Sequence, residues 1–118
     1  MENIRYKFRA WDIQTESMRD VLVIDRVNEL IDLSGGIIER RAHEVELMQS
    51  TGLKDKNGVQ IYEGDIVILC WSDEVGESHW GKVIIKNPFE YTPEEARYFI
   101  YSDEIEVIGN IYQNNDLI

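Results

Sequence analysis

The sequence has little of what stabilises or anchors proteins outside the cytoplasm. Its single cysteine, Cys70, cannot form an internal disulfide, which suits a reducing compartment. Its longest clean apolar run, from Ile66 to Trp71, is far shorter than the ~20 residues that span a bilayer. The first residues lack the basic and apolar segments of a signal peptide. We therefore expect a cytoplasmic protein that does not interact with membranes.

Basic side chains are also scarce, with 12 Lys and Arg against 23 Asp and Glu and a net charge of −11. Residues 46–118 hold five basic and fourteen acidic side chains. Residues 1–45 are more balanced, with seven basic and nine acidic side chains. Nucleic-acid affinity comes mainly from Lys and Arg clustered on phosphates, so we expect no nucleic-acid binding by the acidic part. A local basic face in the first part stays open, from Arg5, Lys7, Arg9, Arg40 and Arg41.

The sequence contains no catalytic, cofactor or metal signature. Cys70 and His79 resemble a nucleophile and a base across an expected hairpin, but a cysteine that ends an apolar run is ordinarily a small hydrophobic residue. A zinc site needs four ligands, and Cys70, His43 and His79 lack paired spacing. Aligning Gly58 with the invariant glycine of a calcium loop leaves the first and last ligand positions without acids. We expect no enzyme activity, no cofactor and no metal.

Alternating and β-branched patterns predict strands along most of the chain. The predicted strands cover residues 6–13, 18–24, 44–49, 59–62, 66–71, 80–86, 98–101 and 104–108. Residues 27–33 fit either a strand or a short helix, and residues 93–97 and the C-terminal end fit single helical turns. Strands at this spacing, joined by short loops, indicate a small barrel or roll.

Two turns are predicted to have special backbone geometry. Asn57 and Gly58 precede an alternating run, and both tolerate the positive φ that a type I′ turn requires at its two central positions. Gly64 can adopt a backbone conformation closed to other residues, and Asp65 can accept hydrogen bonds from amides in the turn. We predict a structural role for all four residues.

Four stretches of the sequence are distinctive in combination. They are residues 7–12 (KFRAWD), residues 47–49 with 51–58 (LMQ and TGLKDKNG), residues 61–67 (IYEGDIV) and residues 107–112 with Asn114 (VIGNIY). Together they resemble the YopX family of phage and prophage proteins. Ser50 and Asn115 depart from the family pattern, in which an aromatic residue and a proline are common at these places.

The resemblance implies a β-dominated, all-β protein. Residues 1–45 would form an N-terminal β subdomain, and residues 46–118 an SH3-like β-roll. It implies a phage or prophage protein in the cytoplasm of a bacterial host cell, and it implies no known activity.

We interpret the chain as a non-catalytic protein-binding or assembly module whose protein partner the sequence does not name. The alternative is a nucleic-acid-associated accessory protein or an acidic DNA mimic. Trp11 shares a strand face with Lys7 and Arg9, so these three either form a partner surface or pack inside. An acidic patch without exposed aromatic residues would favour the mimic, and a pocket with convergent polar groups would favour an enzyme. Unpaired strand edges lead us to expect a homo-oligomer.

Overall fold

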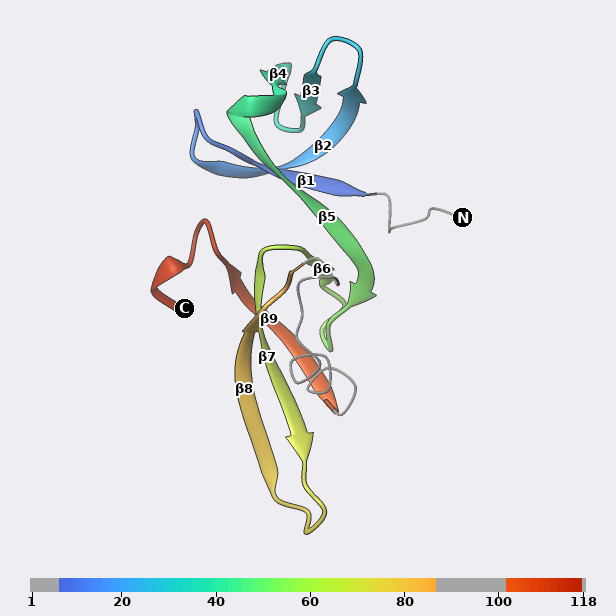
Figure 1. Cartoon of the computed structure of the whole chain (residues 1–118), viewed down its shortest axis with the longest axis vertical. Helices are drawn as coiled ribbons and strands as arrows, with labels where there is room; N and C mark the ends of the chain where they lie inside the picture. The colour runs from blue at the N-terminus through green and yellow to red at the C-terminus, as the bar shows by residue number, and fades with distance from the viewer. Residues whose placement is uncertain (1–6, 87–101, 118) are drawn as a thin grey trace. The chain divides into compact units, whose positions relative to one another are not determined.

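A computed structural model describes residues 7–86 and 102–117 of the 118-residue chain. In this part, the strands are β1 Phe8–Asp12, β2 Ser17–Asp25, β3 Leu30–Leu33, β4 Ile38–Arg41, β5 Val45–Lys54, β6 Gln60–Tyr62, β7 Asp65–Ser72, β8 Ser78–Ile84 and β9 Glu104–Asn110 (Figure 1). Among the described residues, the helices are two short 3₁₀ turns, Ala42–Glu44 and Asn115–Leu117. No helix within the described residues is long and apolar enough to cross a membrane. The all-β prediction is confirmed.

The chain divides into two compact units, residues 1–50 and residues 51–118. One sheet has the strand order β4-β3-β2-β1-β5-β6, and β5 continues from unit 1 into unit 2. The other sheet has the order β8-β7-β9 and belongs to unit 2. The described residues form no closed barrel, so the SH3-like roll stays a prediction. The boundary expected between residues 45 and 46 lies at the start of β5.

Residues 27–33, which fitted a strand or a helix, form the end of a turn followed by β3. Asp25 fixes this turn because its carboxylate accepts the amides of Val27 and Asn28, at 3.0 and 3.1 Å. The helical turn expected at residues 93–97 and the strand expected at residues 98–101 lie outside the described residues.

Unit 1 buries a small apolar cluster next to a buried acid. Ala10, Ile31, Leu33 and Val45 form the cluster, and Val21 and Ile38 pack against it. Asp12 lies on the same face of β1 as Ala10, two residues along the strand, and its side chain has no exposed surface. An unpaired buried carboxylate is costly, so its partners decide whether this core is stable.

The carboxylate of Asp12 holds two arginines and a threonine. Arg40 donates from Nε and Nη2 to the two oxygens, at 3.0 and 3.2 Å. Thr15 donates its hydroxyl at 2.6 Å, and Arg19 Nε lies 3.7 Å away. Burial raises the pKa of Asp12, but the hydrogen bonds from Arg40 and Thr15 outweigh it and lower the pKa below its ordinary 3.8. Asp12 is therefore ionised and paired at neutral pH.

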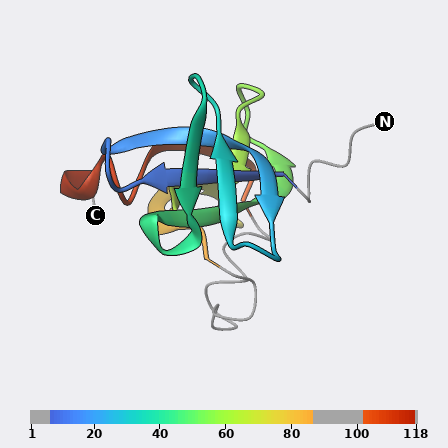
Figure 2. The same ribbon diagram turned by 90° about the horizontal axis from the view of Figure 1, so that it is seen from above.

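The contact between Asp12 and Arg40 requires the sheet of unit 1 to curl. Three steps of strand pairing separate β4 from β1 in the order β4-β3-β2-β1. Neighbouring strands lie ~4.8 Å apart, so a flat sheet would hold these two strands ~14 Å apart. Seen from above, β3 and β4 cross β1 at a steep angle (Figure 2). β2 carries a bulge between Val21 and Val23, which increases its local twist.

Unit 2 packs one face of its sheet on a second apolar cluster. The buried members are Ile61, Val67, Leu69 and Ile85, and partly buried Trp71, Val83, Ile105 and Val107 pack against them. Gly64, with φ 87, and buried Asp65 lead the chain into β7. The Asp65 carboxylate accepts the amide of Tyr62 at 2.8 Å, so this acid holds the turn that starts the strand.

Asp55 organises the turn between β5 and β6. Its Oδ1 accepts the amides of Asn57 and Val59, each at 2.9 Å, and its carbonyl accepts the amide of Gly58. Its Oδ2 accepts the amide of Val107 in β9 at 3.0 Å, so the turn covers the outer edge of that strand. Burial raises the pKa of Asp55, but these amides outweigh it, and the pKa lies below 3.8.

The predicted type I′ geometry is wrong at Asn57. A type I′ turn needs positive φ at both central residues, but the described non-glycine residues with positive φ are Glu16 and Glu29. The hydrogen bonds instead match a three-residue loop, in which a type I turn is followed by a left-handed glycine, here Gly58 with φ 82. Asp55, and not Asn57, provides the side-chain oxygens.

Replacing Asp12 with Asn should lower the free energy of unfolding by about 3 kcal/mol, because Arg40 loses the charge that compensates its own. Urea unfolding followed by circular dichroism measures this change. Glu39→Gln, an exposed position on the same strand as Arg40, is the matched control and should change stability by less than ~0.5 kcal/mol. A loss for Asp12→Asn no larger than that of the control would contradict this structural role.

The lowered pKa values of Asp12 and Asp55 also predict a pH dependence. Because folding lowers both values, each carboxylate contributes its full stability above pH 3.8 and loses it as the pH falls below that value. The Tm should therefore fall steeply below about pH 4. Asp12→Asn should show a shallower fall, because the group that titrates has been removed. An identical acid slope in the wild type and in this variant would be the contrary result.

Candidate functional site

The outer end of the β7–β8 hairpin extends past the start of β9. β7 pairs with β8 from Ile66 to Ser72, but it pairs with β9 only from Asp65 to Cys70. Trp71 and Ser72 therefore have a described partner strand on one side alone. Figure 1 shows the hairpin as a long pair of arrows that ends in the tip loop, residues 73–77.

A cleft of about 350 Å³ opens at this end of unit 2. On β7 the lining includes the small residues Cys70 and Ser72, which share one face of the strand, and Trp71, which lies on the other face. Trp80 of β8 and Glu104 of β9 lie on its two sides, because each pairs directly with Cys70. The lining residues are Cys70, Trp71, Ser72, Ser78, His79, Trp80, Asp103 and Glu104.

Trp80 is 66% exposed, although tryptophan is a highly buried residue on average. The alternation of β8 explains this position. His79 and Gly81 face the opposite side of the hairpin from Trp80. There Gly81 leaves room for the ring of Trp71, which a Cβ at this glycine would approach to 3.7 Å. Trp71 therefore packs toward the apolar cluster, whereas Trp80 lies on the other face of the hairpin, and both tryptophans contribute to the lining of the cleft.

The tip loop repeats the hydrogen bonding of the Asp55 turn. Asp73 Oδ1 accepts the amides of Val75 and Glu77, at 3.0 and 2.8 Å. The amide of Gly76 donates to the Asp73 carbonyl, and Gly76 has φ 85. Both turns have the spacing Asp-x-x-Gly, so one local rule forms both hairpins.

The two turns differ in the second carboxylate oxygen. Asp55 uses it for an amide of β9, whereas Asp73 Oδ2 lies 2.8 Å from Nε2 of His79. The hydrogen bond with His79, followed by that from the Glu77 amide, lowers the pKa of Asp73 below 3.8. Asp73 therefore fixes the position of a surface side chain, His79, whereas Asp55 joins its turn to strand β9.

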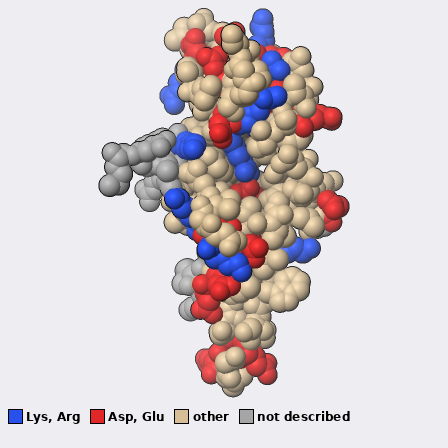
Figure 3. All heavy atoms as spheres, turned by 180° about the vertical axis from the view of Figure 1, so that it is seen from behind, with Lys and Arg blue, Asp and Glu red and all other residues tan. Residues whose placement is uncertain are grey.

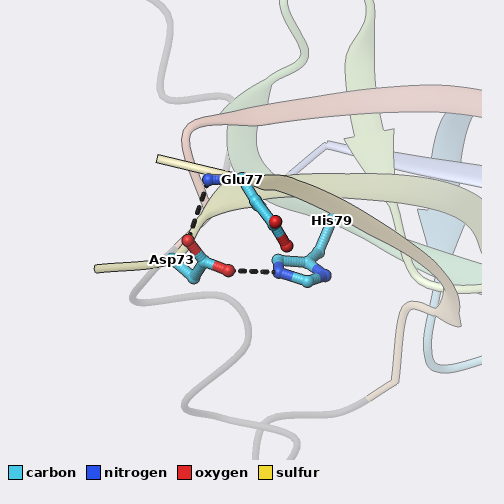
Figure 4. A group of neighbouring side chains, drawn as sticks. All are labelled: Asp73, Glu77 and His79. Carbon is cyan, nitrogen blue, oxygen red and sulfur yellow. Dashed lines mark hydrogen bonds and ion pairs between the residues drawn. The ribbon is translucent and has the colours of Figure 1, made fainter. Parts of the chain in front are cut away.

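Asp73, Glu77 and His79 gather at the tip, with their nearest donor atoms within 4.8 Å of one another (Figure 4). One imidazole and two carboxylates are a donor set that suits zinc or manganese. The ring of His79 also stacks on Trp71, with centroids 5.9 Å apart and planes at 23°. The hydrogen bond between Asp73 and His79 accounts for their approach without an ion, so the geometry is compatible with a metal but does not require one.

Lys56 is the cation that the fold places beside the acidic side of the cleft. Its Nζ lies 3.5 Å from Glu104 and 3.3 Å from Glu106. The hydrogen bond with Glu106 is the largest of the causes that raise the pKa of Lys56. The three side chains are between 41% and 55% exposed, and such exposed pairs contribute little to stability.

Comparison with known proteins identifies the family. A model of the YopX family, described as YopX protein, matches residues 7–118. The chain belongs to the YopX family. It is similar to protein EF1440 from Enterococcus faecalis, known from a crystal structure, with 27% identity and a TM-score of 0.58 over 94% of this chain and 96% of that chain. No curated protein matches it.

The three residues that fitted either a partner surface or internal packing are only partly exposed in this YopX chain. Lys7, Arg9 and Trp11 each have intermediate exposure. In the pairing of β1 with β5, Arg9 lies opposite Met48, which is buried. The structure keeps Arg9 and Trp11 on one face of β1, as the alternation predicts, but that face is partly covered.

The structure separates Cys70 from His79. Cys70 pairs with Trp80, whereas His79 pairs with Trp71, so the side chains of Cys70 and His79 lie on opposite faces of the hairpin. A thiol and an imidazole placed in this way do not form a nucleophile and its base.

Sequence reasoning missed the cleft of this YopX chain. The small residues Cys70 and Ser72 and the aromatic Trp80 are a local signal, because they share one face of a predicted hairpin. The position of Glu104 opposite Trp80 depends on the register of β9, which no local pattern sets.

The shared geometry of the two turns predicts matched effects of Gly58→Val and Gly76→Val. A Cβ on either glycine meets no atom within 4 Å, so any loss comes from the positive φ alone. Each variant should lose at least ~1 kcal/mol of unfolding free energy, because a β-branched residue resists that conformation. Chemical denaturation measures both losses. An unchanged stability for Gly58→Val would contradict the turn assignment.

Proposed function

We propose that this YopX-family chain is a non-catalytic protein-binding module that acts in a phage or prophage setting. The cleft face of unit 2 is its binding surface. The exposure of Trp80 beside a concave site is the observation that supports this function most. Tryptophan is enriched among the residues that dominate binding energies at protein interfaces. At 66% exposure, Trp80 contributes little to the core and presents a large area to a partner.

A cleft also fits an enzyme, but the groups around this one support binding better. The Cys70 thiol and the His79 ring lie on opposite faces of the hairpin. The carboxylate of Asp73 is engaged by amides of its own turn and by His79. Among the described residues of the cleft, no nucleophile has a hydrogen-bonded base, which an acyl- or group-transfer enzyme would need.

Part of the basic surface that the alternative nucleic-acid function would need is covered. The side chain of Arg40 is only 15% exposed, because it faces the Asp12 carboxylate, whereas Arg41 is exposed. Arg9 has intermediate exposure, and Arg5 lies outside the described residues. Acidic side chains gather instead at the tip of the β7–β8 hairpin (Figure 3). An exposed aromatic ring adjoins this acidic tip, which favours a protein-binding site over a DNA mimic.

Site-specific photo-crosslinking tests the proposed function in cells of the native host. A photoreactive phenylalanine analogue at position 80 should yield defined protein adducts after illumination. The same analogue at position 27 of unit 1, where Val27 is 90% exposed, is the control and should yield fewer adducts. An adduct with a second copy of the chain would identify the expected homo-oligomer. Equal adduct yields at the two positions, or none at position 80, would contradict the proposal.

We also predict no binding to single- or double-stranded DNA at physiological salt. Residues 46–118 hold fourteen acidic and five basic side chains, which repel phosphates. A gel-shift assay at micromolar protein measures this directly. Tight, salt-sensitive binding that vanishes in a Lys7→Ala, Arg9→Ala double variant would favour the alternative function instead.

A further inference from the structure

The cleft has an aromatic residue and an acidic residue on the two sides of Cys70, a small residue of the central strand. Trp80 lies on one side and Glu104 on the other, and both pair with Cys70 on the central strand. Because neighbouring strands are ~4.8 Å apart, the backbone positions of Trp80 and Glu104 are ~10 Å apart. A planar cation that stacks on the ring at ~4 Å and donates hydrogen bonds to the carboxylate at ~3 Å fits this width.

The charge around the cleft selects a cation. Asp103 and Glu104 line it directly, and the tip loop, residues 73–77, adds three acidic residues and no basic one. The chain as a whole has a net charge of −11. A basic partner is therefore attracted over a distance before any contact forms.

A guanidinium group can interact with both Trp80 and Glu104 better than an ammonium group can. It is planar and weakly hydrated, so it stacks on an aromatic ring while its edge donates to a carboxylate. Lysine carries a compact and strongly hydrated charge that cannot do both in the same way. Lys56 already lies 3.5 Å from Glu104, so a bound guanidinium competes with this residue for the carboxylate.

We infer that the cleft binds an arginine side chain from a basic protein segment. The guanidinium stacks on Trp80 and pairs with Glu104 and Asp103. This inference rests on the proposed protein-binding function and specifies the chemistry of the partner.

A blocked peptide of the sequence Gly-Ser-Arg-Gly-Arg-Ser-Gly is the probe. Its binding is followed by ¹⁵N NMR, through the indole N–H signal of Trp80 and the amides of the cleft. The same peptide with citrulline in place of arginine keeps the shape but loses the charge, and it should bind at least about fivefold more weakly. A citrulline peptide that binds equally well would overturn the inference.

Charge-matched variants separate this site from general attraction to an acidic protein. The double variant Asp103→Asn, Glu104→Gln should weaken arginine-peptide binding at least about fivefold. The double variant Glu16→Gln, Glu39→Gln removes the same charge from exposed positions of unit 1 and should change binding less than about twofold. Equal losses in the two double variants would show non-specific attraction and overturn the inference.

Two further variants test the aromatic side and the competing lysine. Trp80→Leu keeps apolar bulk but removes the aromatic face, so binding should weaken about threefold or more. Lys56→Gln should strengthen binding, whereas Lys54→Gln removes the same charge elsewhere and should strengthen it less. Circular dichroism checks that each variant is folded.

The outcomes distinguish this inference from the proposed function. Crosslinked partners at position 80 together with failure of the arginine peptide would leave the protein-binding function standing and refute the arginine chemistry. Failure of both would refute both.

Discussion

The buried ion pair of Asp12 and Arg40 is the contact on which the curled sheet of unit 1 depends. It joins an edge strand to a strand three places away in the same sheet, at 3.0 Å. Curling lets the strands of unit 1 enclose a small core, with four buried apolar side chains and two partly buried ones packed against them. The cost of leaving either charge unpaired inside this core gives the sheet one preferred curvature.

Acidic side chains have two roles in this chain, and burial separates them. Asp12, Asp55 and Asp65 are buried and accept hydrogen bonds from arginine or from backbone amides, so they hold strands and turns together. Asp103 and Glu104 are exposed at the start of β9, across the cleft from Trp80. The Asp73 turn lies between these roles, because it repeats the backbone geometry of Asp55 and directs its spare oxygen to a surface histidine. A strongly acidic composition is thus compatible with a specific fold and with a localised binding face.

Local patterns in the sequence predicted most of the described strands, because side-chain alternation acts over a few neighbours, but they did not predict β4, Ile38–Arg41. They failed where the deciding partner is distant or where two local solutions compete. Asp12 lies within a strongly alternating strand, but its partner Arg40 is 28 residues away, so no local signal marks it as a buried acid. In the sequence Asp55-Lys56-Asn57-Gly58, Asn57 and Asp55 both suit a tight turn, and the amide of Val107 favours Asp55. The cleft could not be predicted from local patterns either, because it depends on the register of β9, which places Glu104 beside Cys70 on the central strand.

The coupling free energy between Asp12 and Arg40 tests this account most directly. A double-mutant cycle of Asp12→Asn, Arg40→Gln and the combined variant measures it through urea unfolding. The account predicts a coupling above ~1 kcal/mol, with the combined variant less destabilised than the sum of the single variants, because removing both charges leaves neither unpaired. Losses that add to within ~0.3 kcal/mol would contradict it.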